Sequence, residues 1–406
     1  MKLHSVFWYL LLLLMPVQLG KHFWPAFSFV QGLRIDYLSP TVYLTDLIII
    51  GILINWLVEK VKSQKSKVKI TSKNSKVLIL FLCLLVFLLI NCLFAQNQGA
   101  AFYLLIKIIE FVFLGIYIIQ NHYQASRFSL PVSISVIYSS LFAVIQFLKQ
   151  KSLGGIMYWL GERTFDAGTP GIAKAIINGQ LVLRPYATFP HPNALAGFLL
   201  VGFILSFPYW WKRNRSFSFL YIILVVSAIF LSFSRSVWLA GILILVWIIG
   251  KKVFLSASLI IGLIFIFAFS QLSGSEAIFQ RVDLNIAAIK MFQQSPILGV
   301  GLNNFIVRLP EFWNDSGQVL WYQAVHNIFL LVLAETGFVG LVLFLWLLFQ
   351  TLKRIPASHF SLLASLSVIL FLGLFDHYWL TLQSTQLLFT IVLGLSWSKP
   401  RLTRYN

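Results

Sequence analysis

Three stretches of this chain place histidine, arginine or amide side chains beside apolar segments. The first, residues 184–195, reads R-P-Y-A-T-F-P-H-P-N-A-L and contains Arg184, His191 and Asn193. Proline restricts the residue before it and is tolerated in the first turn of a helix, so this stretch predicts an extended approach to a helix start. The free N–H groups of a helix N-terminus favour an anion. The stretch is therefore either an anion-binding site or a rigid loop in which His191 caps the helix.

The second stretch, residues 232–238, reads S-F-S-R-S-V-W and places Arg235 in a very short turn between two apolar segments. Arginine at a helix end commonly extends toward water or lipid phosphate, which is the simpler interpretation. No acidic residue lies near it in sequence, and a guanidinium binds phosphate through two parallel hydrogen bonds. We expect Arg235 to bind phosphate.

The third stretch, residues 325–340, places His326 and Asn327 at the start of an apolar helix and Glu335 nine residues further on. A histidine at the water boundary can accept a proton near neutral pH, although it can also be a plain interfacial residue. A carboxylate within an apolar helix is costly unless it is paired. Nine residues turn a helix by about two and a half turns, so Glu335 faces away from His326 and is expected to support a neighbouring helix.

Two weaker patterns accompany these stretches. Residues 296–305 read P-I-L-G-V-G-L-N-N-F, in which the glycines allow a close backbone approach and Asn303 adds an amide. Lys107 and Glu110 lie three residues apart in one apolar segment, and we expect them to neutralise each other.

The composition predicts that these side chains are held by helices in a membrane. Of the 406 residues 59% are hydrophobic and 11% are charged, whereas soluble proteins carry about a quarter charged residues. Apolar runs of about 17–20 residues, the length of a membrane-crossing helix, recur along the chain. They predict one all-α polytopic membrane domain, residues 1–406, with about twelve helices, at 5–20, 41–58, 77–95, 102–120, 129–148, 193–210, 217–233, 236–250, 253–270, 327–350, 360–376 and 382–398.

The net charge of +19 is concentrated in alternate loops rather than spread over a surface. Nucleic-acid binding is therefore not expected, and the pattern indicates that the basic loops and both termini face the cytoplasm. The clusters are the lysine-rich segment 60–76, Lys212 with Arg213 and Arg215, Lys251 with Lys252, Lys353 with Arg354, and Lys399 with Arg401 and Arg404.

Two loops on the opposite, external side are long, residues 150–192 and 271–326, and long loops in compact proteins are usually functional. The second contains a predicted amphipathic helix over 276–294, which we expect to lie on the membrane surface. The first apolar segment has a single Lys2 before it and no small-residue cleavage pattern after it, so we expect an anchor helix rather than a removed signal peptide. Cys83 and Cys92 share one apolar run and indicate neither a disulfide framework nor a metal site.

The four motifs within the stretches described above, taken in their order along the chain, resemble those of the O-antigen ligase and O-antigen polymerase family of bacterial envelope enzymes. They cover residues 184–346, whereas the N-terminal half is similar only in hydropathy and helix number. In one respect the chain departs from the family, whose second external loop is often larger and richer in arginine. Arg281 and Arg308 are the only arginines of that loop here. The motifs are R-P-Y-A-T-F-P-H-P-N, S-F-S-R-S-V-W-L-A, P-I-L-G-V-G-L-N-N-F and H-N-I-F-L-L-V-L-A-E-T-G-F-V-G-L.

The resemblance implies a GT-C-like glycosyltransferase of the bacterial inner membrane that uses glycan carried on undecaprenyl diphosphate. Such enzymes transfer the glycan to another glycan, a lipid or a protein on the periplasmic side, without metal or cofactor and with inversion. It implies that Arg184 and Arg235 bind the diphosphate and that His326 orients or deprotonates the acceptor hydroxyl. Preorganised arginines help most where charge develops. We add to the substrate-binding candidates His191, Asn193, Asn303, Asn327 and Arg281, with Glu335 as a supporting residue.

Two other classes of function remain as alternatives. About twelve helices is a common number for a secondary transporter of a small solute, but transporters place polar groups near the bilayer midplane and often carry an internal repeat. Here the polar clusters lie at the external boundary and no repeat is visible. A scaffold or sensor without catalytic activity is disfavoured because no segment resembles a signalling domain. Ligase and polymerase cannot be separated from these residues.

Overall fold

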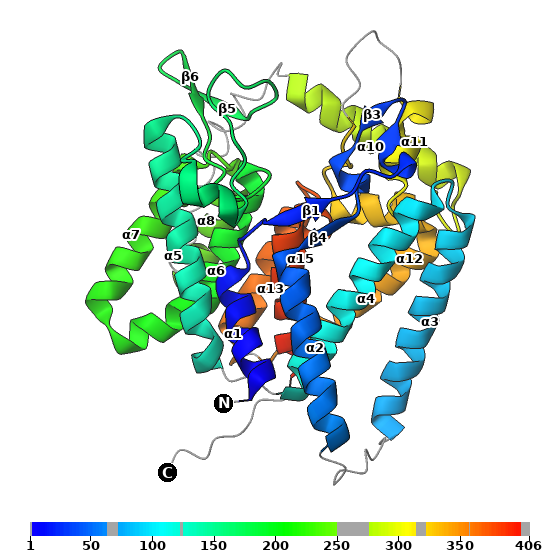
Figure 1. Ribbon diagram of the computed structural model, residues 1–406, viewed down its shortest axis with the longest axis horizontal. Coiled ribbons are helices and arrows are strands. Elements are labelled where there is room, and N and C mark those ends of the chain that lie inside the picture. The colour runs from blue at the N-terminus through cyan, green and yellow to red at the C-terminus, as the bar shows by residue number, and fades with distance from the viewer. Residues whose placement is uncertain are drawn as a thin grey trace.

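The computed structural model describes residues 2–62, 72–121, 125–249, 276–313, 322–356 and 358–398. A bundle of helices runs between two ends of the molecule (Figure 1). One end carries the short strands together with α10 and α11, and we call it the strand-bearing end. The N-terminus lies at the other end.

The described part of the chain is mostly helical. Its α-helices are α1 (Leu3–Leu14), α2 (Leu44–Lys62), α3 (Ser72–Phe94), α4 (Gln98–Asn121), α5 (Ala125–Lys149), α6 (Pro192–Arg213), α7 (Arg215–Leu231), α8 (Arg235–Ile249), α10 (Glu276–Gln294), α11 (Phe305–Phe312), α12 (Ile328–Arg354), α13 (Phe360–Gly373), α14 (Tyr378–Thr381) and α15 (Gln383–Trp397). The 3₁₀ turns are η1 (Ala26–Ser28), η2 (Asp36–Leu38) and η3 (Gly155–Leu160), and the strands are β1 (Gly20–His22), β2 (Phe29–Val30), β3 (Leu33–Arg34), β4 (Thr41–Tyr43), β5 (Lys174–Ile177) and β6 (Gln180–Leu183).

Four helices of the described ranges are long and apolar enough to cross a membrane. They are Gln98–Asn121, Phe128–Lys149, Pro192–Arg213 and Ile328–Arg354. Five further apolar helices are shorter: Leu3–Leu14, Cys83–Phe94, Arg215–Leu231, Arg235–Ile248 and Phe360–Gly373. The predicted helix 253–270 lies outside the described residues. The helix predicted over 276–294 is α10.

Helix α6 lies at the centre of the bundle. It packs against α5, α7, α8, α13 and α15. Its start is set by Pro192 in the first turn and by the His191 side chain, which accepts a hydrogen bond from the Asn193 N–H. Small residues allow its neighbours to approach closely: a Cβ added at Gly197 would lie 2.4 Å from the Tyr378 hydroxyl oxygen. The beginning of α6 is therefore held rigidly at the strand-bearing end.

The expectation of an all-α fold is wrong for the loops at the strand-bearing end. These contain three two-stranded antiparallel sheets, β1–β4, β2–β3 and β5–β6. Two-residue turns with positive φ, Gln31-Gly32 and Asn178-Gly179, connect β2 to β3 and β5 to β6. An Asn-Gly pair between apolar runs is a strong hairpin signal. Helix α1 also ends at Leu14, before the predicted residue 20, so the segment 15–43 is a third structured loop.

Helix α12 is interrupted where the loop 296–304 contacts it. Gly337 has a φ of 65° and a ψ of −166°, which breaks the helical hydrogen bonding. The N–H groups of Val300 and Gly301 donate to the carbonyl oxygens of Ala334 and Glu335, at 2.9 and 3.0 Å. Backbone groups freed within a membrane helix need partners inside the protein, and this loop supplies them. The glycine pair of the loop thus makes a close backbone approach.

Candidate functional site

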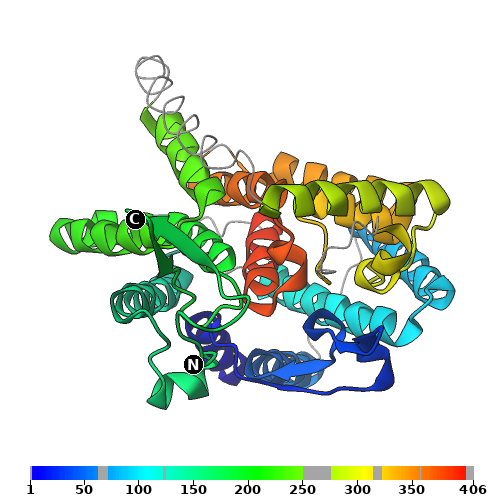
Figure 2. The same ribbon diagram turned by 90° about the horizontal axis from the view of Figure 1, so that it is seen from above.

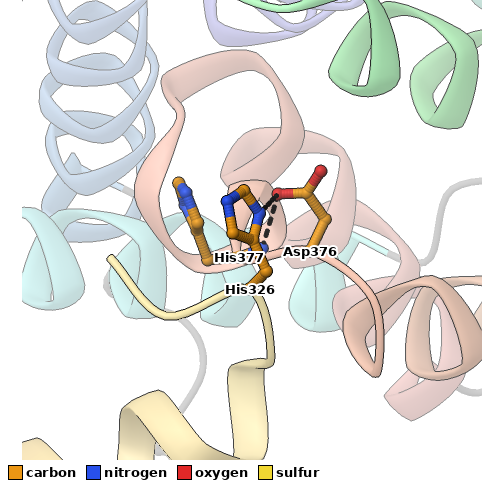
Figure 3. Close-up of side chains that lie close together, drawn as sticks. All are labelled: His326, Asp376 and His377. Atoms are coloured by element: carbon orange, nitrogen blue, oxygen red, sulfur yellow. Dashed lines mark hydrogen bonds and ion pairs between the residues drawn. The ribbon is translucent and has the colours of Figure 1, made fainter. Parts of the chain in front are cut away.

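His326 and Asp376 form the centre of the polar site. His326 lies just before α12, and Asp376 lies between α13 and α14. The Nδ1 atom of His326 is 3.2 Å from Oδ1 of Asp376 (Figure 3). When Nδ1 carries the ring proton and donates it to Asp376, Nε2 is left as the basic nitrogen. The pair can therefore take a proton from a hydroxyl group placed beside Nε2.

Two further groups hold the Asp376 carboxylate in place. The backbone N–H of His377 donates to Oδ1 at 2.9 Å, and Nδ2 of Asn193 donates to Oδ2 at 3.0 Å. The pKa of Asp376 lies well below its usual value: burial alone would raise it, but the charge and hydrogen bond of His326, with smaller contributions from His377 and His191, outweigh burial. Asp376 is thus an anion beside His326.

His377 packs against His326 on the side away from Asp376 (Figure 3). The two ring centroids are 5.2 Å apart, and the His377 ring also meets the ring of Tyr37 edge-on at 5.5 Å. Its Nδ1 atom is 2.7 Å from the Thr381 hydroxyl oxygen. Burial lowers the pKa of His377 to about 3, so this ring is neutral at physiological pH. It forms a neutral wall of the site.

Arg184 approaches the same site from the loop before α6. Its Nε donates to the Ser232 carbonyl oxygen at 2.7 Å, and its Nη2 donates to Oδ1 of Asn193 at 2.6 Å. Both acceptors are neutral, and no carboxylate of the described residues forms an ion pair with Arg184. Burial lowers the pKa of Arg184 to about 10, so it stays charged at neutral pH. Asn193 thus connects Arg184 to Asp376.

His191 occupies the capping position of α6. Its Nδ1 accepts the Asn193 N–H at 3.1 Å, which is the structural role considered for it from the sequence. Burial lowers the pKa of His191 to about 4, with opposing effects from Asp376 and Arg184. His191 is therefore neutral and lies within electrostatic range of both groups.

Two further arginines lie near this centre. Arg235 is the first residue of α8, and its charge contributes to lowering the pKa of Arg184. Arg281 projects from α10, where its Nη1 donates to the Phe375 carbonyl oxygen at 3.1 Å, one residue before Asp376. Its charge influences Arg184, His191 and His377. Arg184 thus lies within electrostatic range of Asp376, Arg235 and Arg281.

The other candidates have contacts within the fold. Asn327 caps α12 by accepting the N–H groups of Phe329 and Leu330. The Asn303 amide lies 3.4 and 3.3 Å from the carbonyl oxygens of Tyr37 and Ala100. These contacts place Asn327 beside the His326–Asp376 pair and Asn303 between η2 and α4.

Glu335 is buried, and its hydrogen bonds go to residues outside the His326–Asp376 site. Its Oε1 accepts the N–H of Phe305, the first residue of α11, at 3.2 Å. A carboxylate at a helix N-terminus is favourable. Its carbonyl oxygen accepts hydrogen bonds from Gly301 and from the Asn91 side chain. Glu335 therefore holds the loop 296–304 and α11 against α12.

The sequence interpretation did not single out Asp376 or His377. It placed Asp376 inside a helix over 360–376, whereas α13 ends at Gly373 and leaves both residues in a short turn. The sequence did contain a signal for them, because Asp376 and His377 are adjacent ionisable residues in an otherwise apolar stretch. An ionisable residue within a membrane segment is by itself a reason to expect a functional site.

His326, Asp376 and His377 also form a group of potential metal ligands, with atoms within 4.8 Å of one another. Two histidines and a carboxylate are a common ligand set for zinc. Hydrogen bonds already account for each side chain: His326 to Asp376, and His377 to Thr381. The arrangement is therefore explained as a hydrogen-bonded histidine–aspartate pair.

Comparison with known proteins identifies one part of the chain. A family model described as O-antigen ligase matches residues 193–345. The matched range includes Asn193, Arg235, Arg281 and His326, while Arg184 and Asp376 lie outside it. No curated protein matches the chain.

Proposed function

We propose, on the premise that the match over residues 193–345 reflects membership of the O-antigen ligase family, that this chain transfers glycan from an undecaprenyl-diphosphate carrier. The acceptor is a second glycan, a lipid or a protein. The observation that carries this proposal is the His326–Asp376 pair, which lies near Arg184 and Arg281, two arginines whose hydrogen bonds go to neutral oxygen atoms. Base and anion-binding groups are the two requirements of the reaction.

His326 is the general base of the proposed reaction. Nε2 of His326 takes the proton from the acceptor hydroxyl as its oxygen bonds to the anomeric carbon of the donor sugar. Asp376 holds the ring through Nδ1 and stabilises the imidazolium that forms. The bond between that carbon and the diphosphate oxygen breaks, and undecaprenyl diphosphate leaves with the electron pair. Attack from the face opposite the leaving group inverts the anomeric centre.

The arginines stabilise the leaving group. The diphosphate gains negative charge as its bond to the sugar breaks, and fixed guanidinium groups act most strongly on such developing charge. Arg184 is fixed by Asn193 and Ser232, and Arg281 by the Phe375 carbonyl. Because these arginines supply the positive charge, the proposed reaction needs no metal ion and no cofactor.

The orientation in the membrane follows from the two ends of the helices. The site lies where α6, α8 and α12 begin, whereas Arg213 and Lys353 lie where α6 and α12 end. Basic residues favour the cytoplasmic side, so the site belongs to the periplasmic side of the bacterial inner membrane. There the diphosphate of an isoprenoid carrier sits at the bilayer boundary. We retain about twelve crossings, a GT-C-like arrangement and cytoplasmic termini as parts of this proposal.

The test uses the purified protein in liposomes that contain lipid-linked glycan and an acceptor glycan. We expect transfer from the diphosphate-linked donor, none from a nucleotide sugar, and the same rate with and without EDTA. Transfer that requires a nucleotide sugar would overturn the donor assignment, and loss of transfer with EDTA would overturn metal independence.

A secondary transporter is the alternative considered from the sequence, and the comparisons give it no support. Transporters often place broken helices and ionisable groups at the midplane. The break in α12 is closed by backbone hydrogen bonds from the loop 296–304, and Lys107 is paired with carboxylates. Both features are accounted for without a transported solute.

A further inference from the structure

The 3₁₀ turn η3, in the loop between α5 and β5, exposes three large apolar side chains. Ile156 is 73% exposed, Tyr158 58% and Trp159 66%. Figure 2 shows this segment at the edge of the molecule, beyond α1. Residues of this size and polarity are normally covered, by protein or by lipid.

A buried carboxylate fixes the entry to this turn. Glu162, just after η3, accepts the backbone N–H groups of Leu153 and Gly154 at 2.7 and 2.8 Å. It also accepts Nε2 of Gln146 on α5 at 2.6 Å. The two ends of η3 are thereby drawn together, so the turn is presented as a rigid unit.

The segment that follows α1 fixes the other side of the turn. The Gln18 N–H donates to the Leu160 carbonyl oxygen at 3.1 Å. Gly161 has a φ of 89°, and a Cβ there would lie 2.4 Å from the Gln18 carbonyl carbon. Because Gln18 comes four residues after the end of α1 at Leu14, η3 is held at the level where α1 reaches its end.

The neighbouring surface has the character of a membrane boundary. On α5, Leu141, Ile145 and Leu148 form an exposed apolar stripe that reaches the last turn of the helix. Exposed basic residues flank η3 in the sequence: Lys149, Lys151 and Arg163. Aromatic side chains at the interface with lysine and arginine beside them are typical of segments that bind anionic membranes.

We propose that η3 is an interfacial anchor, which inserts Ile156, Tyr158 and Trp159 among phospholipids while the adjacent basic residues bind anionic headgroups. The proposal rests on the membrane orientation given above, but not on the transfer reaction. Gln146 connects the anchor to the site, because its Oε1 accepts the N–H groups of Tyr186 and Ala187. The anchor thus stabilises the segment after β6 that contains Arg184.

Spin labels test this placement against a control of equal exposure. Ile176 in β5 is 72% exposed but projects with the β5–β6 hairpin at the top of Figure 1, away from the bundle. Ile156→Cys and Ile176→Cys are each labelled in a Cys83→Ala, Cys92→Ala background, in nanodiscs with anionic phospholipid and without substrate. Trp159→Cys provides a second label in the turn.

Collision with oxygen and with a water-soluble nickel chelate reports whether lipid or water surrounds each label. We expect an oxygen-to-nickel collision ratio several-fold higher at positions 156 and 159 than at 176. A ratio at 156 and 159 equal to that at 176 would show a water-exposed turn and overturn the proposal. Low collision with both reagents would show a protein cover, such as a second copy, and would also overturn it. Neither result bears on the transfer reaction.

Discussion

Two polar clusters in this protein differ in the partners of their positively charged side chains. Within the bundle, Lys107 lies 2.6 Å from Asp46 and 3.3 Å from Glu110, so one cation meets two carboxylates. At the strand-bearing end, Arg184 and Arg281 lie near Asp376, and their hydrogen bonds go to neutral oxygen atoms.

This difference separates a structural cluster from a binding site. Charges buried in a membrane protein must be neutralised by the protein or by a ligand. The Lys107 cation is paired within the protein, and Asp46 also accepts hydrogen bonds from the Tyr43 N–H and the Gln383 side chain. The arginine cluster has an excess of positive charge, which is what an anionic diphosphate requires. Changes at the two clusters should therefore have different consequences.

The largest expected effect on the reaction is that of His326→Ala. Loss of a general base slows transfer by about 10² to 10⁴-fold. The measurement is the initial rate of glycan transfer in liposomes. The matched control is His359→Ala, because His359 precedes α13 whereas Asp376 follows its other end. A variant with a nearly normal rate would remove His326 from the mechanism.

Arg184→Ala should be next in size. Removal of one donor that stabilises developing charge costs about 10² to 10³-fold in turnover. Arg184→Lys should recover only part of the rate, because lysine keeps the charge but lacks the planar fork. Comparison of kcat and KM, with Arg213→Ala as the control, checks this. An effect confined to the thermal midpoint would give Arg184 a structural role only.

Lys107→Met should affect stability rather than chemistry. It leaves buried carboxylates without their cation, which costs about 3–5 kcal/mol. The combined change Asp46→Asn, Lys107→Met and Glu110→Gln should recover much of this loss, since no uncompensated charge remains. Thermal unfolding in nanodiscs measures both, and the folded fraction should keep its transfer rate. A lower transfer rate per folded molecule would show that the Lys107 cluster also contributes to the transfer reaction.

The smallest effect concerns pH. Burial lowers the pKa of His191 from 6.5 to about 4, so the unfolded state takes up this proton first as the pH falls. The stabilisation is complete above about pH 6.5 and is lost between there and about pH 4. His191→Asn keeps a capping side chain that does not titrate, so its thermal midpoint should fall less over this interval. Equal slopes for variant and wild type would exclude His191 as the source.

The parts of the site that depend on local sequence could be predicted. The helix starts near His191 and His326 follow from proline, asparagine and the onset of apolar residues, and the helix over 276–294 follows from its spacing. Nine residues between His326 and Glu335 were enough to predict separate contacts, and they bind different elements.

The pairings between distant segments could not be predicted from one sequence. Asp376 reaches His326 across 50 positions, and Asp46 reaches Lys107 from another helix, because helix packing decides both. Lys107 and Glu110 were expected to neutralise each other, and the structure adds Asp46 as the nearer carboxylate. The β5–β6 hairpin was missed although its Asn178-Gly179 turn is visible in the sequence.

The most direct test of the account is the release of undecaprenyl diphosphate by the wild type and by Asp376→Asn in identical liposomes with donor and acceptor. The account predicts one carrier released per glycan transferred, and release slower by at least about tenfold in the variant at an unchanged thermal midpoint. Equal release by the two proteins would contradict the claim that the His326–Asp376 pair activates the acceptor.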